Sequence, residues 1–294
     1  MNLAVAATAA SIVILTLAAA VPAAAADGPE VRVRNAVARM VVIVEDRADV
    51  AVEIEPGAGG LPAPKVTRRG NELRIDGDLG RNAVRNCQGA TGPARQPGDG
   101  ASVEVRRHGR IALSAAPLIV VRTPRDVEVN IEQDSAVFGA VGRGARSISL
   151  GNVGCGDWTV ANTDGRLELS LAGSGDIWAG TSGELEISVA GSGDIAAGAT
   201  RDLEASVAGS GDVAVARVDG PVEASIAGSG NVLVRGGNVA HVEASIAGSG
   251  DVQVNARVAS VEGSIVGSGD VRVQAVTGSV SQSSMGSGRV IVGQ

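Results

Sequence analysis

The chain has 294 residues, of which 42 are glycine and 1% are aromatic, with no tyrosine, and its net charge is −7. A globular core of this size normally uses many aromatic side chains, so the composition argues against an ordinary globular domain and favours stacked aliphatic residues. Acidic residues outnumber basic ones 20 to 9 over residues 126–294, and such a surface repels nucleic acid and anionic lipid, which argues against both as partners.

Residues 1–26 have the pattern of a secretory signal peptide. An apolar stretch from Leu3 to Val21 is followed by Pro22 and a run of small residues that ends at Ala26. The segment lacks Lys and Arg, so an uncleaved membrane anchor is the alternative. Nothing later in the sequence is long and apolar enough to span a bilayer. We therefore expect an exported protein, periplasmic, extracellular or at the cell surface, with no membrane span once the signal is removed.

Residues 27–110 predict an irregular β region. The segment from Gly80 to Gly100 is rich in Gly, Pro and Arg and predicts a long loop without strands. The other segments predict strands that cap the open end of a regular fold, because such an end exposes unpaired backbone groups. The strands expected here are Val31–Arg34, Arg39–Glu45, Asp49–Glu55, Lys65–Arg68, Glu72–Ile75 and Ser102–Arg106.

Residues 111–294 predict a β-solenoid. Strands at Leu118–Arg122, Asp126–Ile131 and Ala136–Phe138 precede eight Gly-x-Gly turns that recur every 18 to 20 residues. A fixed period of this size marks a solenoid, so we expect an all-β, right-handed parallel β-helix with coils of about 19 residues. The turn residues are Gly154, Gly156 and Asp157; Gly173, Gly175 and Asp176; Gly191, Gly193 and Asp194; Gly209, Gly211 and Asp212; Gly228, Gly230 and Asn231; Gly248, Gly250 and Asp251; Gly267, Gly269 and Asp270; Gly286, Gly288 and Arg289.

The strands before these turns alternate apolar and polar residues, as in Leu167–Ala172. Alternation with period two places Leu167, Leu169 and Leu171 inside and Glu168 and Ser170 outside. Because every coil repeats this register, like residues stack in columns. The predicted outward columns are Glu168, Glu186, Glu204, Glu223, Glu243 and Glu262, and Ser170, Ser188, Ser206, Ser225, Ser245, Ser264 and Ser283.

The Asp column at the turns is the sharpest functional candidate, because stacked carboxylates repel one another. In the structural interpretation, each Asp accepts backbone N–H groups of its own glycine corner. In the functional interpretation, the column binds calcium. The calcium-binding roll has two glycine-rich segments per coil where this chain has one, and Asn231 within the column favours hydrogen bonding. We expect no metal and no cofactor, with Arg289 ending the column as a cation beside Asp270.

Two further pairs stand out near the start of the repeats. Cys87 and Cys155 are the only cysteines, and an even count in an exported chain predicts a disulfide, with two free thiols as the alternative. His108 and His241 lack metal-ligand spacing relative to them. Trp158 and Trp178 lie on adjacent coils and form a candidate ligand patch; alternatively they pack against the cap.

Repetition argues against catalysis, because an active site needs a unique constellation of residues. The known hydrolase, phosphate-loop and dinucleotide motifs are absent from the sequence. The expected function is therefore non-enzymatic. The alternative is a carbohydrate-active β-helix enzyme that uses one particular pair of acids.

The Gly-Ser-Gly-Asp turns, the strands before them and the segment LIVVRTPRDVEVNIE (Leu118–Glu132) resemble the putative auto-transporter adhesin, head GIN domain family. The resemblance covers residues 31–294 and is clearest over residues 118–290. That family comprises secreted or surface bacterial proteins with a β-solenoid fold. The resemblance implies an adhesion-like surface module. Its partner stays open between a cell-surface glycan, a cell-surface protein and a second copy of the chain. A second alternative is a structural protein that assembles end to end through its last coil, which carries Val290, Ile291 and Val292.

Overall fold

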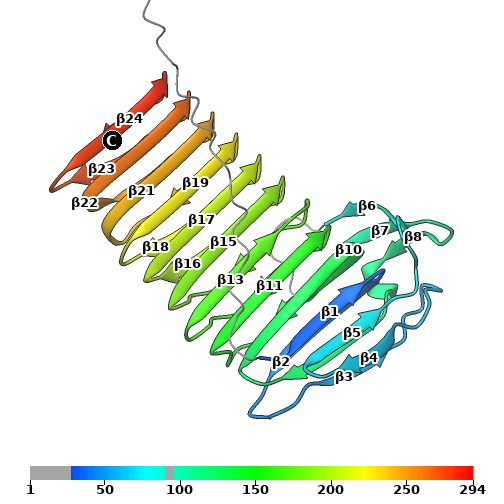
Figure 1. The fold of residues 1–294 in the computed structure, drawn as a ribbon. Coiled ribbons are helices and arrows are strands. Elements are labelled where there is room, and N and C mark those ends of the chain that lie inside the picture. Colours follow the sequence, from blue (N-terminus) through cyan, green and yellow to red (C-terminus); the bar gives the residue numbers. More distant parts are fainter. Residues whose placement is uncertain (1–27, 90–95, 294) are drawn as a thin grey trace, which may run out of the picture.

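The computed structural model describes residues 28–89 and 96–293, and the predicted signal peptide lies outside them. It shows one elongated stack of parallel strands (Figure 1), so the predicted all-β solenoid is confirmed. Within the described residues, the only helical element is the 3-10 turn η1 (Leu113–Ala115). From β10 (Asp126–Val141) onward, the chain winds through about nine turns of about 19 residues.

Each regular coil contributes one strand before its glycine turn and one after it, and β22 runs continuously from one coil into the next. The strands before the turns are β11 (Ser147–Gly154), β13 (Arg166–Leu171), β15 (Glu184–Gly191), β17 (Asp202–Gly209), β19 (Val222–Gly228), β21 (Asn238–Gly248), β22 (Val252–Gly267) and β24 (Val280–Gly286). The strands after the turns are β12 (Trp158–Val160), β14 (Ile177–Ala179), β16 (Ile195–Thr200), β18 (Val213–Val218), β20 (Val232–Val234), β23 (Val271–Val276) and β25 (Val290–Val292).

Equivalent residues of successive coils pair in register and so build the core. Leu167 pairs with Leu185, Leu185 with Leu203 and Leu203 with Val222. All four side chains are at most 3% exposed. Aliphatic and β-branched residues suit such a pleated, buried surface, which is why this core needs almost no aromatic residues.

The first two strands lie inside the stack rather than outside it. β1 (Glu30–Arg34) pairs in parallel with both β10 and β5 (Glu72–Asp76). β2 (Val37–Val44) does the same with β10 and β9 (Leu118–Thr123). One coil is thus formed by β1 and β2, and it lies between a coil built from β5 and β9 and the coil built from β10. The N-terminal strands therefore form the second coil of the solenoid, and the first coil is formed by the later strands β5 and β9.

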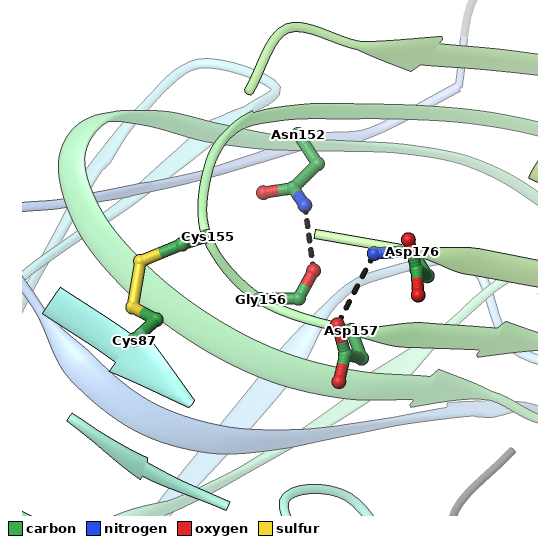
Figure 2. Close-up of a disulfide and its surroundings, with 6 residues drawn as sticks. All are labelled: Cys87, Asn152, Cys155, Gly156, Asp157 and Asp176. Atoms are coloured by element: carbon green, nitrogen blue, oxygen red, sulfur yellow. Dashed lines mark hydrogen bonds between the residues drawn. A yellow bond between two sulfur atoms is a disulfide. The ribbon is translucent and has the colours of Figure 1, made fainter. Parts of the chain in front are cut away.

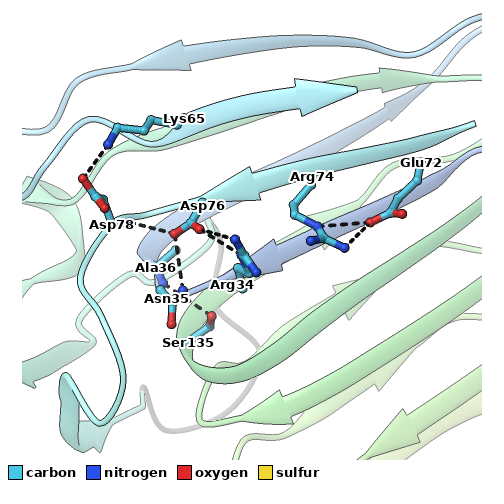
Figure 3. Close-up of polar contacts among 9 residues, drawn as sticks. All are labelled: Arg34, Asn35, Ala36, Lys65, Glu72, Arg74, Asp76, Asp78 and Ser135. Carbon is cyan, nitrogen blue, oxygen red and sulfur yellow. Dashed lines mark hydrogen bonds and ion pairs between the residues drawn. The ribbon is translucent and has the colours of Figure 1, made fainter. Parts of the chain in front are cut away.

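The end of the stack beyond β5 and β9 is covered by two antiparallel strands. β3 (Ala51–Glu55) pairs with β9, and β4 (Lys65–Arg69) pairs with β5. One ion pair supports this cover: Lys65 Nζ of β4 lies 2.7 Å from Asp78 Oδ2 (Figure 3). A second joins the two coils beneath it, where Arg34 Nη2 of β1 lies 2.8 Å from Asp76 Oδ2 of β5. Strands β3 and β4 satisfy the edge that an open solenoid would leave unpaired.

A separate three-stranded sheet packs against the side of the first coils (Figure 1). It consists of β6 (Val84–Gln88), β7 (Ser102–Val105) and β8 (Gly109–Ala112). Its residues Val103 and Ile111 form a second core with Phe138 of β10. The expected strand-free loop from Gly80 to Gly100 was therefore wrong in part, because β6 lies within it. The pattern of β6 is weak because most of its side chains are exposed.

On the side of β24, the last coil places polar residues at two interior positions. Gln282 and Ser284 of β24 stand opposite Gly263 and Ile265 of β22. The side chain of Gln282 donates to Ser284 Oγ at 3.1 Å and accepts the backbone N–H of Val290 at 2.9 Å. On this side the apolar core therefore ends in uncharged polar residues, whereas Val290 and Val292 of β25 continue the aliphatic columns of Val271 and Val273.

Candidate binding surface

The glycine turns stack directly on one another, and their backbone atoms are in close contact between coils. At Gly209 the φ angle is 138°, a conformation that residues with a Cβ atom rarely adopt. At Gly211 a Cβ atom would lie 2.2 Å from the carbonyl oxygen of Gly193. Both glycines of a turn are therefore needed for the close approach of the neighbouring coil, and from Gly191 to Gly286 the first glycine is also needed for its positive φ angle.

The Asp column forms a hydrogen-bonded ladder that runs from coil to coil. The carboxylate of Asp176 accepts the backbone N–H of Asp194 at 3.0 Å, and Asp194 accepts that of Asp212 at 2.8 Å. The same contact is made at all the remaining steps of the column: Asp157 with Asp176 (Figure 2), Asp212 with Asn231, Asn231 with Asp251, Asp251 with Asp270, and Asp270 with Arg289.

This ladder corrects the expectation that each Asp accepts N–H groups of its own corner, because the donor belongs to the next coil. Arg289 stands at the end of the column beside Asp270, as expected. Arg289 contributes its backbone N–H, whereas the guanidinium that pairs with the column belongs to Arg272 of β23, which contacts both Asp251 and Asp270. A purely local turn would need no register between coils, whereas this ladder fixes that register.

We expect Asp194→Asn to preserve stability and Asp194→Ala to lower the free energy of unfolding by about 1 kcal/mol. Asn keeps the oxygen that accepts the N–H of Asp212, as Asn231 does naturally in the same column, whereas Ala removes it. Chemical denaturation of both variants measures the difference. Equal losses in the two variants would show that charge matters and the accepted hydrogen bond does not.

Chelators should leave the melting temperature unchanged, because the column carboxylates already accept backbone hydrogen bonds. Across residues 28–89 and 96–293, no group of three or more His, Cys, Asp or Glu side chains is arranged to hold a metal ion. Thermal melting with and without EDTA checks this. A large drop with EDTA that calcium reverses would instead establish the calcium interpretation.

The outward faces of β13, β15, β17, β19, β21 and β22 form what we call the Glu–Ser face. Glu186 pairs with Glu204 and Ser188 with Ser206, and the same register holds from Glu168 to Glu262 and from Ser170 to Ser283. A shallow hollow in this face is lined by Arg166, Glu184, Glu186, Asp202, Leu203, Glu204, Pro221 and Glu223. Arg166 forms an ion pair with Glu186 and so balances part of the charge at one end of the hollow.

The Glu column contains one buried member, Glu168, whose side chain belongs to a residue only 7% exposed. Burial and the neighbouring carboxylates of Glu186 and Glu128 raise the pKa of Glu168 above its ordinary value of 4.5, while Arg166 and a hydrogen bond from Ser149 oppose the rise. Partial burial and its two column neighbours also raise the pKa of Glu204. A folded-state pKa above the unfolded value means that the folded protein binds the proton more tightly.

The free energy of unfolding should therefore rise as the pH falls from 7 toward 4.5, and Glu168→Gln should remove much of that rise. Asp126 sets the lower end of the pH range in which stability rises. The hydrogen bond from Arg146 outweighs burial and lowers the pKa of Asp126 below 3.8, so the stability that its carboxylate contributes is lost only in stronger acid. Urea midpoints of both proteins at several pH values test this. Parallel pH profiles would contradict the role given to Glu168.

The predicted disulfide between Cys87 and Cys155 is confirmed, with a Cα–Cα distance of 6.0 Å. It joins β6 of the side sheet to the first glycine turn (Figure 2). The same turn is held from inside by Asn152, a fully buried residue whose side-chain amide donates to the carbonyl of Gly156 at 2.8 Å.

The two tryptophans do not form one patch. Trp158 is fully buried, and its ring packs so closely on Gly139 that a Cβ there would lie 2.3 Å from it. Trp158 pairs with Ile177, and Trp178 pairs with Thr159, so the two rings lie on opposite sides of the sheet. Only Trp178 reaches the surface, where it lines a small hollow with Gln96, Asp99 and Asp157.

Sequence reasoning missed three residues that shape these surfaces: Arg166, Arg272 and Asn152. Arg166 and Asn152 break the repeat at their own positions, whereas Arg272 lies in a column without a consensus residue. Arg166 stands where the next coils have Glu184 and Asp202, and Asn152 is a polar residue opposite the inward Leu171. For Arg166 and Asn152, the departure from the residue type of the neighbouring coils could have identified them; for Arg272 the repeat carries no such signal.

In the part of the chain that the structure describes, no helix has the length and apolar character needed to cross a membrane. No curated protein matches the sequence. Among solved structures, a putative adhesin from Bacteroides fragilis matches with 14% identity and a TM-score of 0.37, covering 90% of this chain and 93% of its own. The sequence profile described as "putative auto-transporter adhesin, head GIN domain" matches residues 33–217, which confirms the resemblance. The chain therefore belongs to the putative auto-transporter adhesin, head GIN domain family.

Proposed function

We propose that this protein is an exported, non-enzymatic, adhesion-like module of a bacterial envelope that binds a cell-surface glycan or protein through its Glu–Ser face. One observation carries the proposal: the same outward Glu and Ser side chains recur in register over six coils. A surface of identical sites suits a repetitive or extended partner, because many weak contacts act together.

Membership of an adhesin family supports this function. The disulfide between Cys87 and Cys155 supports export, since disulfides persist in oxidising compartments. Fractionation of the producing cell, with thiol labelling of Cys87 and Cys155, tests the location. Recovery in the cytoplasm with both thiols free would overturn the proposed export.

Binding is tested by presenting the purified full chain to a glycan array and to whole bacterial cells. Three cumulative variants, Glu204→Gln, then Glu223→Gln, then Glu243→Gln, remove one carboxylate per coil from the Glu–Ser face. We expect binding to fall stepwise with each coil altered. The matched control neutralises exposed acids at the covered end of the stack, Asp46, Glu53 and Glu55, and should bind like the unaltered chain.

A carbohydrate-active enzyme is the competing function, and the raised pKa values of Glu168 and Glu204 near Arg166 favour it. Incubation with extracellular polysaccharides, followed by detection of new reducing ends or unsaturated products, distinguishes the two. Turnover that is abolished by Glu168→Gln or Glu204→Gln alone, and is insensitive to changes in other coils, would replace the binding proposal.

A further inference from the structure

The last coil ends in an exposed, unpaired strand. All seven residues of β24 are exposed, and Met285 and Val280 remain 74% and 48% accessible. Among residues 28–89 and 96–293, β24 pairs with β22 alone. The backbone N–H and C=O groups along its other edge therefore point away from the stack and are free to pair with another strand.

This edge also lacks the charges that normally block strand pairing. From Val273 to Gly288 the sequence contains no Asp, Glu, Lys or Arg. The Glu column stops in the same coil, because Ser281 stands opposite Glu262, the last of the six Glu residues that the preceding coils place at this position. Protein edges are usually protected by charge, proline or a covering element, and β24 has none of these among its own residues.

The opposite end of the solenoid is protected both by a covering element and by charge. Antiparallel strands β3 and β4 cover it, and they carry Glu53, Glu55, Lys65, Arg68 and Arg69. An open-ended chain of molecules would need one end to pair with the other, which this charged cover prevents. Association of like ends about a two-fold axis closes after two copies.

We propose that two copies of this chain associate through the last coil, with β24 of one copy antiparallel to β24 of the other. The two copies are related by a two-fold axis perpendicular to the long axis of the stack. β24 and β25 are the last strands on the two sides of the same coil, so this axis also places β25 of one copy opposite β25 of the other. The layer of Gln282 and Ser284 then meets its own copy. Their side chains are uncharged and already hydrogen-bonded, so contact buries no unpaired charge. This inference is independent of the ligand proposed for the Glu–Ser face.

Light scattering coupled to size-exclusion chromatography tests the proposal with the purified full chain over a wide concentration range. The unaltered protein should have twice the chain mass and should dissociate on dilution. Ser283→Lys places a charge on the pairing edge and should weaken association by roughly tenfold or more, since like charges brought opposite one another repel. The matched control is Ser245→Lys, which alters the same column at an exposed position in an inner coil and should leave the dimer intact.

Circular dichroism checks that each variant is folded, and Met285→Lys serves as a second edge variant if Ser283→Lys does not fold. A monomer at every concentration would overturn the proposal. So would a dimer that persists in both edge variants, which would place the contact elsewhere. Growth into larger open assemblies would overturn the closed two-fold arrangement and point to pairing of unlike ends.

Discussion

Replacing Gly211 with valine should lower the free energy of unfolding by roughly 3–5 kcal/mol, the largest single effect expected in this protein. A Cβ atom at this position lies 2.2 Å from the carbonyl oxygen of Gly193 and 3.0 Å from Val189 Cγ1. The contact is with backbone, so it can be relieved only by separating two coils, which breaks the hydrogen bonds on both sides of the turn. Chemical denaturation and thermal melting measure the loss.

Two variants separate this contact from general effects of substitution. Gly236→Ala introduces a Cβ where no atom lies within 4 Å, so it should change stability little. Glu204→Gln alters an outward side chain of the neighbouring strand β17 and should cost less than Gly211→Val. Equal melting temperatures for Gly211→Val and either control would refute the close-contact argument.

Removing the disulfide by the double substitution Cys87→Ser and Cys155→Ser should cost about 4 kcal/mol on the chain-entropy estimate for a loop of this length. The two cysteines are 68 residues apart in sequence, so the bond restricts a large part of the unfolded chain. The loss should be concentrated in β6, β7 and β8, because this small sheet packs against the solenoid through a modest core of its own.

Hydrogen exchange locates the effect. In the double variant, amides of β6 to β8 should exchange much faster, while those of β17 to β21 should keep their protection, because a solenoid coil depends mainly on its neighbours. Reductant should change the unaltered protein in the same way and leave the double variant unaffected. Uniform loss of protection along the whole stack would contradict a local role for the bond.

The repeated part of the fold was predictable because every coil has the same alternation of apolar and polar residues and the same glycine turn. Alternation in segments such as Leu167–Ala172 fixes which side chains face inward, and the glycine turns fix the period. The repeat also aligned the Glu, Ser and Asp columns correctly, since any shift by one residue would have exposed the aliphatic core.

What escaped prediction depends on contacts that the repeat does not encode. The position of β1 and β2 within the stack requires pairing with β5, β9 and β10, which are distant in sequence. The orientation of Trp158 was missed because a shift of one residue relative to Trp178 moves a side chain to the other face of the sheet. The direction of the Asp ladder was missed because local turn chemistry says nothing about the next coil.

The placement of β1 and β2 between two later coils has a consequence for how the molecule is built. As the chain emerges from its N-terminus, this pair of strands has no neighbour on either side until β5, β9 and β10 have followed. The N-terminal third must therefore wait and assemble as one unit, with long-range contacts that are slow to form. Every coil after β10 can instead settle onto a finished template as soon as it is made. Folding of the solenoid is thus limited by assembly of its N-terminal part, after which the later coils add one at a time.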